Sequence, residues 1–237
     1  MGKKEEVVVE EEVQTSTTTD LVDYEAMLAK EAEEVDDSIG SSESVKISVD
    51  GKKFTFPDGH VVNAPFSFII LDWRNVNLYY TKQYKKGEYS PPTCGAIGKD
   101  KHDQLAPQSD ANEVQHDNCT DCPMQQWGSD PQGGRGKACK NRVKLAVVLP
   151  DAGENADIYT MEVSPTAIKG WNSYVKRIKN DLKTLPVAVI TELDFHAHET
   201  YPTLIFPKTT PKHTNLGIMM KLRERAQAIL DEPIPFD

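Results

Sequence analysis

The feature that most constrains this chain is the placement of its four cysteines, which all fall between residues 94 and 139. Two of them form a Cys-x-x-Cys pair followed by proline, and one further cysteine lies on each side of the pair. Four thiolates, two of them held in a tight turn, are a ligand set that binds Zn²⁺ tetrahedrally. The pattern therefore predicts a structural zinc ion, in a site that holds loops together and does no chemistry, on Cys94, Cys119, Cys122 and Cys139.

Two other uses of the cysteines stay open at this point, namely disulfide bonds and an iron–sulfur cluster. No cysteine lies outside the cluster, and residues 1–20 lack the apolar core of a secretion signal. These observations favour a reducing compartment, the cytoplasm, where thiols at this spacing bind metal. His116, three residues before the Cys-x-x-Cys pair, is a substitute ligand if one cysteine is not bound.

The formal net charge of −10 divides unevenly along the chain. Residues 1–44 carry 3 Lys against 14 Asp or Glu, and residues 231–237 carry three acids and no base. The body between them, residues 45–230, has 24 bases and 20 acids, a net of +4. Acidic ends on a basic body are common where the ligand is a polyanion, because an acidic end can occupy the binding groove. Solubility alone is the simpler explanation of the acidic ends.

These shifts in composition predict three regions. Residues 1–44 are expected to form an acidic, largely disordered segment with one short helix over residues 20–36. Residues 45–230 form the folded domain, with the zinc insertion at about 94–139, and residues 231–237 form an acidic tail. No apolar run is long enough to span a bilayer, so we expect a soluble protein without a membrane partner.

Short strands separated by turn residues dominate the body. A hairpin is predicted from residues 45–49 and 52–56 around an Asp50-Gly51 turn. One helix is predicted after Ser164-Pro165, with an apolar face that reaches Leu182, and another after residue 214 or 215. Further strands are expected at 66–73, 77–84, 140–149, 157–163, 185–195 and 203–206. This order favours a mainly β, α+β fold with helical decorations, and within that class an OB-fold-like small barrel with a zinc-ribbon insertion.

The strand after the last cysteine carries a row of cations. Lys140, Arg142 and Lys144 are two residues apart, so they project from one face of the strand, while the apolar residues between them project from the other. Such a row can follow a sugar–phosphate backbone. Arg135 and Lys137 lie among glycines just before it, and glycine lets a backbone approach a ligand closely. The alternative is an ordinary solvent-exposed strand face.

Aromatic residues and bases interleave in the same body. Proteins that bind single-stranded nucleic acid without sequence preference use rings as stacking platforms in a cationic groove. Tyr79 and Tyr80 must face opposite sides of a strand, so one of the two is expected in the core. Any single ring can equally be part of the core. The predicted contacts from this pattern are Trp73, Arg74, Tyr80, Tyr84 and Trp127.

The end of the sequence, from Leu230 to Asp237, resembles the acidic tip of bacterial single-stranded-DNA-binding proteins, in which acids precede Ile-Pro-Phe. The resemblance implies that the tip recruits replication or recombination proteins. The residues that match it are Asp231, Glu232, Ile234, Pro235 and Phe236, although Pro233 interrupts the acidic run and Asp237 follows the phenylalanine.

The body also resembles, more loosely, phage-encoded single-stranded-DNA-binding proteins that carry an OB-fold, an inserted zinc site and an acidic tail. This resemblance covers residues 45–149 and the tail, and it implies a role in phage DNA replication or recombination in the host cytoplasm. The predicted function is therefore sequence-tolerant binding of single-stranded DNA. The alternative is a zinc-stabilised adaptor or regulator that binds a host replication or transcription protein through its acidic ends.

Enzyme functions are not expected. The glycine-rich segment at 133–137 lacks the spacing of a nucleotide-binding loop. The proline that follows the Cys-x-x-Cys pair would precede it in a zinc deaminase. His196 and His198 have no third ligand at a suitable spacing, so we interpret them as structural.

Overall fold

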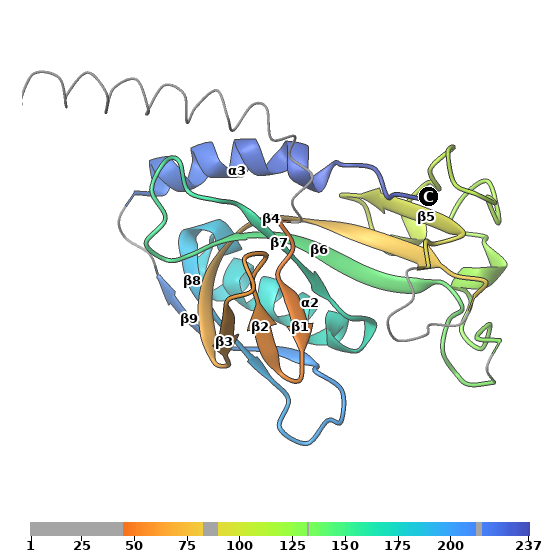
Figure 1. Ribbon diagram of the computed structural model, residues 1–237, viewed down its shortest axis with the longest axis horizontal. Helices are drawn as coiled ribbons and strands as arrows, with labels where there is room; N and C mark the ends of the chain where they lie inside the picture. The colour runs from red at the N-terminus through yellow and green to blue at the C-terminus, as the bar shows by residue number, and fades with distance from the viewer. Residues whose placement is uncertain (1–44, 83–89, 132, 212–214) are drawn as a thin grey trace, which may run out of the picture. The chain divides into compact units, whose positions relative to one another are not determined.

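This computed structural model describes residues 45–82, 90–131, 133–211 and 215–237. Two antiparallel sheets, with helices packed against them, make up this part of the chain (Figure 1). These residues belong to one compact unit, Ser44–Asp237. The predicted acidic segment with its helix, residues 1–44, lies outside the described residues, and so does Tyr84. Within the described residues, no helix is long and apolar enough to cross a membrane.

The smaller sheet is a meander of β1 (Ser48–Asp50), β2 (Lys53–Thr55) and β3 (Val61–Asn63). It confirms the predicted hairpin, but the turn lies one residue later than expected. Gly51 and Lys52 occupy its two central positions with φ of 55° and 62°. Positive φ at both positions matches the right-handed twist of the flanking strands, which is why short hairpins favour it.

The larger sheet has the strand order β7-β6-β4-β8-β9, with β5 paired to β4. Its strands are β4 (Phe66–Tyr79), β5 (Cys94–Gly98), β6 (Lys140–Val148), β7 (Tyr159–Val163), β8 (Val189–Phe195) and β9 (Leu204–Pro211). The mainly β, α+β class is thus confirmed. The described strands do not close into a barrel, because β7 and β9 end the path and do not pair with each other.

The central strand β4 runs for 14 residues where the sequence predicted two separate strands. Its first residues pair with β8, and the rest pairs with β6 and then also with β5. The register with β6 shifts between Ile70 and Asp72, which leaves Leu71 as an extra residue. Such a bulge changes which side chains face each side of the sheet.

Helices and the small sheet cover the two faces of the large sheet. On one face, β2 and α2 (Ile168–Arg177) bury a core that includes Phe54, Phe68, Leu145 and Trp171. On the other face, α3 (Leu216–Leu230) buries a second core with residues such as Ile69 and Ala146. Alternate residues of β4 and β6 therefore enter different cores, which is why both strands contain long apolar runs.

Short helical turns join these elements. The 3₁₀ turns are η1 (His102–Gln104), η2 (Pro123–Gln125), η3 (Pro165–Ala167) and η5 (Pro186–Ala188). The predicted helix start at Ser164-Pro165 is confirmed. Its predicted apolar face is wrong at Leu182, which is exposed, because α2 continues as a π turn, η4 (Ile178–Leu182), that rotates the last residues away from the core.

The aromatic centre of the first core provides a test of the packing. Phe54 is fully buried, and its ring lies 5.1 Å from that of Phe195 and 5.7 Å from that of Phe68. We expect Phe54→Ala to lower the free energy of unfolding by about 3–5 kcal/mol in urea titrations, because it leaves a cavity between the sheets. Tyr201→Ala, at an exposed ring, is the control and is expected to change it by less than about 0.5 kcal/mol. Equal effects of the two substitutions would contradict this packing.

Candidate metal centre and nucleic-acid surface

The four cysteines converge on one cavity of about 20 Å³, as the metal prediction requires. Cys94 begins β5, and Cys139 immediately precedes β6, the two strands that flank the second half of β4. The Cys-x-x-Cys pair is brought to them by two backbone hydrogen bonds. Cys119 N–H donates to Leu105 C=O at 3.1 Å, and Cys139 N–H donates to Met124 C=O at 2.9 Å. A cavity of this size holds about one water-sized sphere, which suits a single ion.

The thiols lie close enough to influence one another. Burial, and to a smaller extent the neighbouring cysteines, raises the pKa of Cys139 to about 12. Burial is also the main cause of the raised pKa of Cys119. Without a cation these thiols stay protonated at neutral pH, and a divalent metal would replace their protons. None of the four cysteines forms a disulfide bond.

Among the described residues, no three His, Cys, Asp or Glu side chains are grouped as the ligands of a bound ion are. His116, the predicted substitute ligand, also lines the cavity, and its Nδ1 lies 3.2 Å from the carbonyl oxygen of Asn118.

Amide side chains that the sequence analysis missed surround this cavity. Gln125 Nε2 lies 3.3 Å from Cys139 Sγ, and Gln125 Oε1 accepts a hydrogen bond from Asn141 at 3.1 Å. Asn141 also donates to the buried Asn77 at 2.5 Å. Such outer contacts orient metal ligands. Scattered amides carry no spacing signal in a sequence, so only the fold brings them together.

The β4–β5 ladder separates the cysteine cavity from a second cavity of about 280 Å³. Cys94 pairs with Tyr79 in the ladder, and both line the cysteine cavity. Tyr80 and Leu78 line the second cavity instead. The prediction that the adjacent tyrosines face opposite sides is thus confirmed. The expectation that one of the two lies in the core is wrong, because both are half-buried and neither ring enters the two main cores.

The predicted row of cations lies on one face of β6, and the intervening Val143 and Leu145 are fully buried on the other, as the alternation predicted. Each cation of the row already has an acidic neighbour. Lys140 Nζ lies 2.8 Å from Asp130, Arg142 lies 2.5 Å from Glu162, and Lys144 lies 3.7 Å from Glu232. Burial raises the pKa of Glu162, but Lys46 and Arg142 outweigh it and leave that pKa below its usual value. The row is therefore charged but internally compensated.

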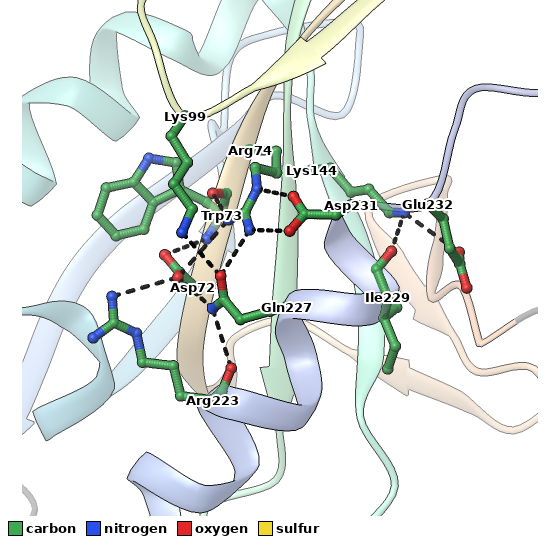
Figure 2. A network of polar contacts seen from close by, with 10 residues as sticks. All are labelled: Asp72, Trp73, Arg74, Lys99, Lys144, Arg223, Gln227, Ile229, Asp231 and Glu232. Atoms are coloured by element: carbon green, nitrogen blue, oxygen red, sulfur yellow. Dashed lines mark hydrogen bonds and ion pairs between the residues drawn. The ribbon is translucent and has the colours of Figure 1, made fainter.

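Arg74, predicted to contact DNA, is instead fully buried. Figure 2 shows its guanidinium within a polar network between β4 and the end of α3. It donates to both carboxylate oxygens of Asp231, at 2.5 and 2.9 Å, and to Gln227 Oε1 at 2.8 Å. Arg74 is buried because Gln227 of α3 and Asp231 of the tail cover it, and the bulge at Leu71 turns it toward them. In this arrangement Arg74 fastens the tail to the sheet and is not available to a nucleic acid.

The predicted stacking rings differ in their exposure. Trp73 is half-buried, and its ring lies 5.4 Å from that of Trp171 in an edge-on contact, so it belongs to the core. Tyr80 is half-buried beside the second cavity. Trp127 is 80% exposed, and Lys137 Nζ lies 5.4 Å from the centroid of its ring. Trp127 and Arg135 both line an open hollow of about 510 Å³.

The loop that carries Trp127 is held in place by hydrogen bonds across its base. Gly128 N–H donates to Gly136 C=O at 2.9 Å, and Ala138 N–H donates to Ser129 Oγ at 2.9 Å. Gly128 has a φ of 87°, which favours glycine. Because this loop begins after Cys122 and ends at Cys139, a metal on the cysteines would stabilise it.

The acidic tail, predicted to occupy the binding groove and to recruit partner proteins, packs against the body. Asp231 is bound by Arg74, and Glu232 lies near Lys144. Ile234 N–H donates to Gln108 Oε1 at 2.9 Å, and Asn112 Nδ2 donates to the carbonyl oxygen of Phe236 at 2.5 Å. These contacts join segments that are far apart in sequence, so no local pattern predicts them.

Known proteins offer no guide to this site: neither a protein family, nor a characterised protein, nor a solved structure matches the chain.

The cysteine cavity predicts that protein prepared with zinc holds about one Zn²⁺ per chain by elemental analysis. Cys139→Ser is expected to reduce this content severalfold, because it replaces a buried thiolate donor. Lower pH should also weaken binding, since the thiols must lose protons to coordinate the metal. Asp121→Asn, an exposed change within the Cys-x-x-Cys turn, is the matched control and should retain the metal. Metal-free protein after such preparation would contradict the assignment.

The burial of Arg74 predicts a large effect on stability. Arg74→Ala removes a fully buried side chain together with its hydrogen bonds to Asp231 and Gln227, and we expect the free energy of unfolding to fall by about 1–3 kcal/mol at pH 7. The hydrogen bond from Arg74 lowers the pKa of Asp231, so the smaller, solvent-screened part of this stabilisation that depends on the Asp231 charge is present above the usual carboxyl pKa, near 4, and is lost as the pH falls through the lowered value.

The control for Arg74→Ala is Lys99→Ala, at an exposed lysine that contacts the same Gln227 and should change stability by less than about 1 kcal/mol. Urea titrations at pH 7 and pH 3 compare the two variants. If both variants had the same small effect at pH 7, Arg74 would not anchor the tail.

Proposed function

We propose that this protein binds single-stranded DNA with little sequence preference and has no catalytic activity. The observation that carries this proposal is the exposed indole of Trp127, beside Lys137 and Arg135 on the loop between Cys122 and Cys139. An exposed ring flanked by cations suits stacking on an unpaired base next to its phosphates. The indole is 80% exposed, so its face is accessible to a base.

The proposed path of the strand continues along β6. The Trp127 loop leads through Lys137 and Cys139 directly into the row of cations, which repeats about every 6–7 Å along one face. Lys140 and Arg142 are about 40% and 35% exposed at their side chains, so a phosphate can reach them. Nucleic acid would replace the acidic partners Asp130 and Glu162, which supports strongly salt-dependent binding.

The proposal includes zinc on the four cysteines and competition from the acidic tail. The zinc would fix the turn and the loop that present Trp127, without taking part in chemistry. Glu232 of the tail already lies near Lys144 of the row, which supports the expectation that removal of the tail tightens DNA binding. The tail would also recruit replication or recombination proteins, and the setting would be phage DNA metabolism in the host cytoplasm.

Within the observed α+β class, we propose an open relative of the OB-fold with a zinc-ribbon insertion. The support is the long strand β4, which pairs with β8 through its first half and with β6 and β5 through its second. One bent strand shared by two groups of partners is a feature of small barrels.

The compensated charges favour one second candidate, a zinc-stabilised adaptor that binds a host protein. Arg142 and Lys140 both have acidic partners within the fold, so the row requires no external anion. In this alternative the acidic ends bind the partner protein, and the row is ordinary surface. Binding of an oligonucleotide distinguishes the two candidates.

A titration of a fluorescein-labelled oligo-dT into the full chain tests the proposal by fluorescence anisotropy. We expect binding at low salt that weakens steeply between about 50 and 200 mM NaCl. Trp127→Ala is expected to weaken it by about 5- to 150-fold, the loss of one stacked base, without unfolding the protein. Tyr201→Ala, another exposed ring, is the matched control. No binding at 50 mM NaCl would reject the proposal and favour the adaptor.

A further inference from the structure

The contacts of the tail identify a specific surface on the β4–β5 ladder. Residues 233–235 line the second cavity together with Val76, Leu78, Tyr80 and Ile97 of the ladder and its continuation. Phe236 follows them and is only 8% exposed. The tail is thus held by apolar contact as well as by the ion pairs of Asp231 and Glu232.

Gly95 of β5 makes this fit possible. A Cβ atom at Gly95 would lie 2.8 Å from Ile234 Cδ1, closer than Cβ atoms approach in proteins, and 3.2 Å from Phe236 Cζ, which is a tight contact. Both apolar residues of the tip therefore rest directly on the backbone of β5. The absence of a side chain at this strand position creates the space that they fill.

The hydrogen bonds that hold the tip come from residues between Cys94 and Cys119. Gln108 accepts the N–H of Ile234, and Asn112 donates to the carbonyl group of Phe236. Both residues belong to the excursion between Cys94 and Cys119.

The excursion is in turn fastened to β5. Gln108 N–H donates to Gly95 C=O at 2.8 Å, and Glu113 N–H donates to Thr93 C=O at 3.0 Å. Leu105 and Cys119 form a small core with Ala96 of the same strand. A metal that holds Cys94 and Cys119 in place would therefore also hold Gln108 and Asn112, the residues that bind the tip.

We propose that the β4–β5 ladder and the excursion form a binding surface for the chain's own Ile-Pro-Phe tip, and that metal on the opposite face of the ladder completes this surface. The proposal rests on the metal centre put forward above. Cys94, which would bind the metal, and Gly95, which carries the tip, are consecutive residues of one strand, so one strand separates the two ligands. Metal occupancy and docking of the tip therefore stabilise each other.

Coupling of this kind is reciprocal. If the metal strengthens docking of the tip by some factor, the docked tip must strengthen metal binding by the same factor. Couplings between sites in proteins typically amount to about 5- to 150-fold. Both directions can be measured on the full chain without any nucleic acid.

The first measurement follows the exposure of the tip. A carboxypeptidase of the serine type, which chelators do not inhibit, digests the full chain with bound zinc and after treatment with EDTA. Mass spectrometry records the release of Phe236, because Asp237 is exposed in either case. We expect release at least fivefold faster without metal, while circular dichroism shows that the sheets remain folded. Equal rates would overturn the proposal.

The second measurement follows the metal. The chromogenic chelator 4-(2-pyridylazo)resorcinol removes zinc from the full chain, and the rate is compared among variants. Gly95→Val, which fills the space under the tip, and the double variant Ile234→Ala with Phe236→Ala should each lose zinc at least fivefold faster. Asp237→Ala, at the exposed end of the tail, is the matched control and should match the parent chain.

A further control excludes a general loss of stability. Ile47→Val weakens the main core, to which neither the tip nor the cysteines belong, and should leave the zinc loss rate unchanged. If Ile47→Val accelerates zinc loss as much as the tip variants do, or if the tip variants lose zinc at the parent rate, the coupling is wrong. If the protein does not bind DNA, the proposed function is rejected but both measurements still test the coupling. If the chain takes up no zinc, the metal centre and the coupling are both rejected.

Discussion

The single extra residue in β4 determines what the second half of the sheet can do. Before Leu71, even-numbered residues such as Phe68 face the first core, whereas after it the odd-numbered Trp73 faces that core. The bulge thereby brings Arg74 onto the face that α3 and the tail cover, where the cations of β6 also lie. It also leaves Asn77 and Tyr79 on the face where the cysteines converge. Together with the alternation of β5, this irregularity separates the cysteine cavity from the tail.

Compensation of charge within the fold is the second general property of this surface. Cations that resemble a nucleic-acid site in the sequence are paired with acids in the structure: Arg142 with Glu162, and Arg74 with Asp231. Exposed pairs of this kind contribute little to stability, so a polyanion can replace their acidic members at small cost. The pair of Arg74 differs, because its guanidinium is fully buried and would lose a charged partner in the interior if Asp231 were displaced. The exposed pairs on β6 can thus exchange their acidic partner for a polyanion, whereas the pair of Arg74 stabilises the fold.

The sequence predicted the secondary structure well wherever residues adjacent in the chain determine it. The alternation along β6, the hairpin near Gly51 and the helix start at Ser164 each depend on neighbouring residues, and each was correctly predicted. The four cysteines, grouped by their spacing in the sequence, line one cavity in the structure, and metal binding there stays a prediction. The division of β4 into two strands was wrong, because polar residues such as Asn77 are buried there by partners distant in sequence.

The candidate site was predicted less well, and the errors share one cause. Arg74 follows a tryptophan in a basic region, which in a sequence is typical of an exposed contact. Its partner Asp231 lies 157 residues away, so its burial cannot be inferred locally. The docked tail depends in the same way on Gln108 and Asn112, which carry no recognisable spacing.

The direct connection between α3 and the tail limits how far the tail can move. Leu230 is fully buried and ends the helix, and the tail residues follow without a spacer. Even fully extended, the six residues from Asp231 to Phe236 span only about 20 Å. An undocked tip would therefore sweep a small volume around the end of α3, and a protein that captures it must approach the same edge of the sheet.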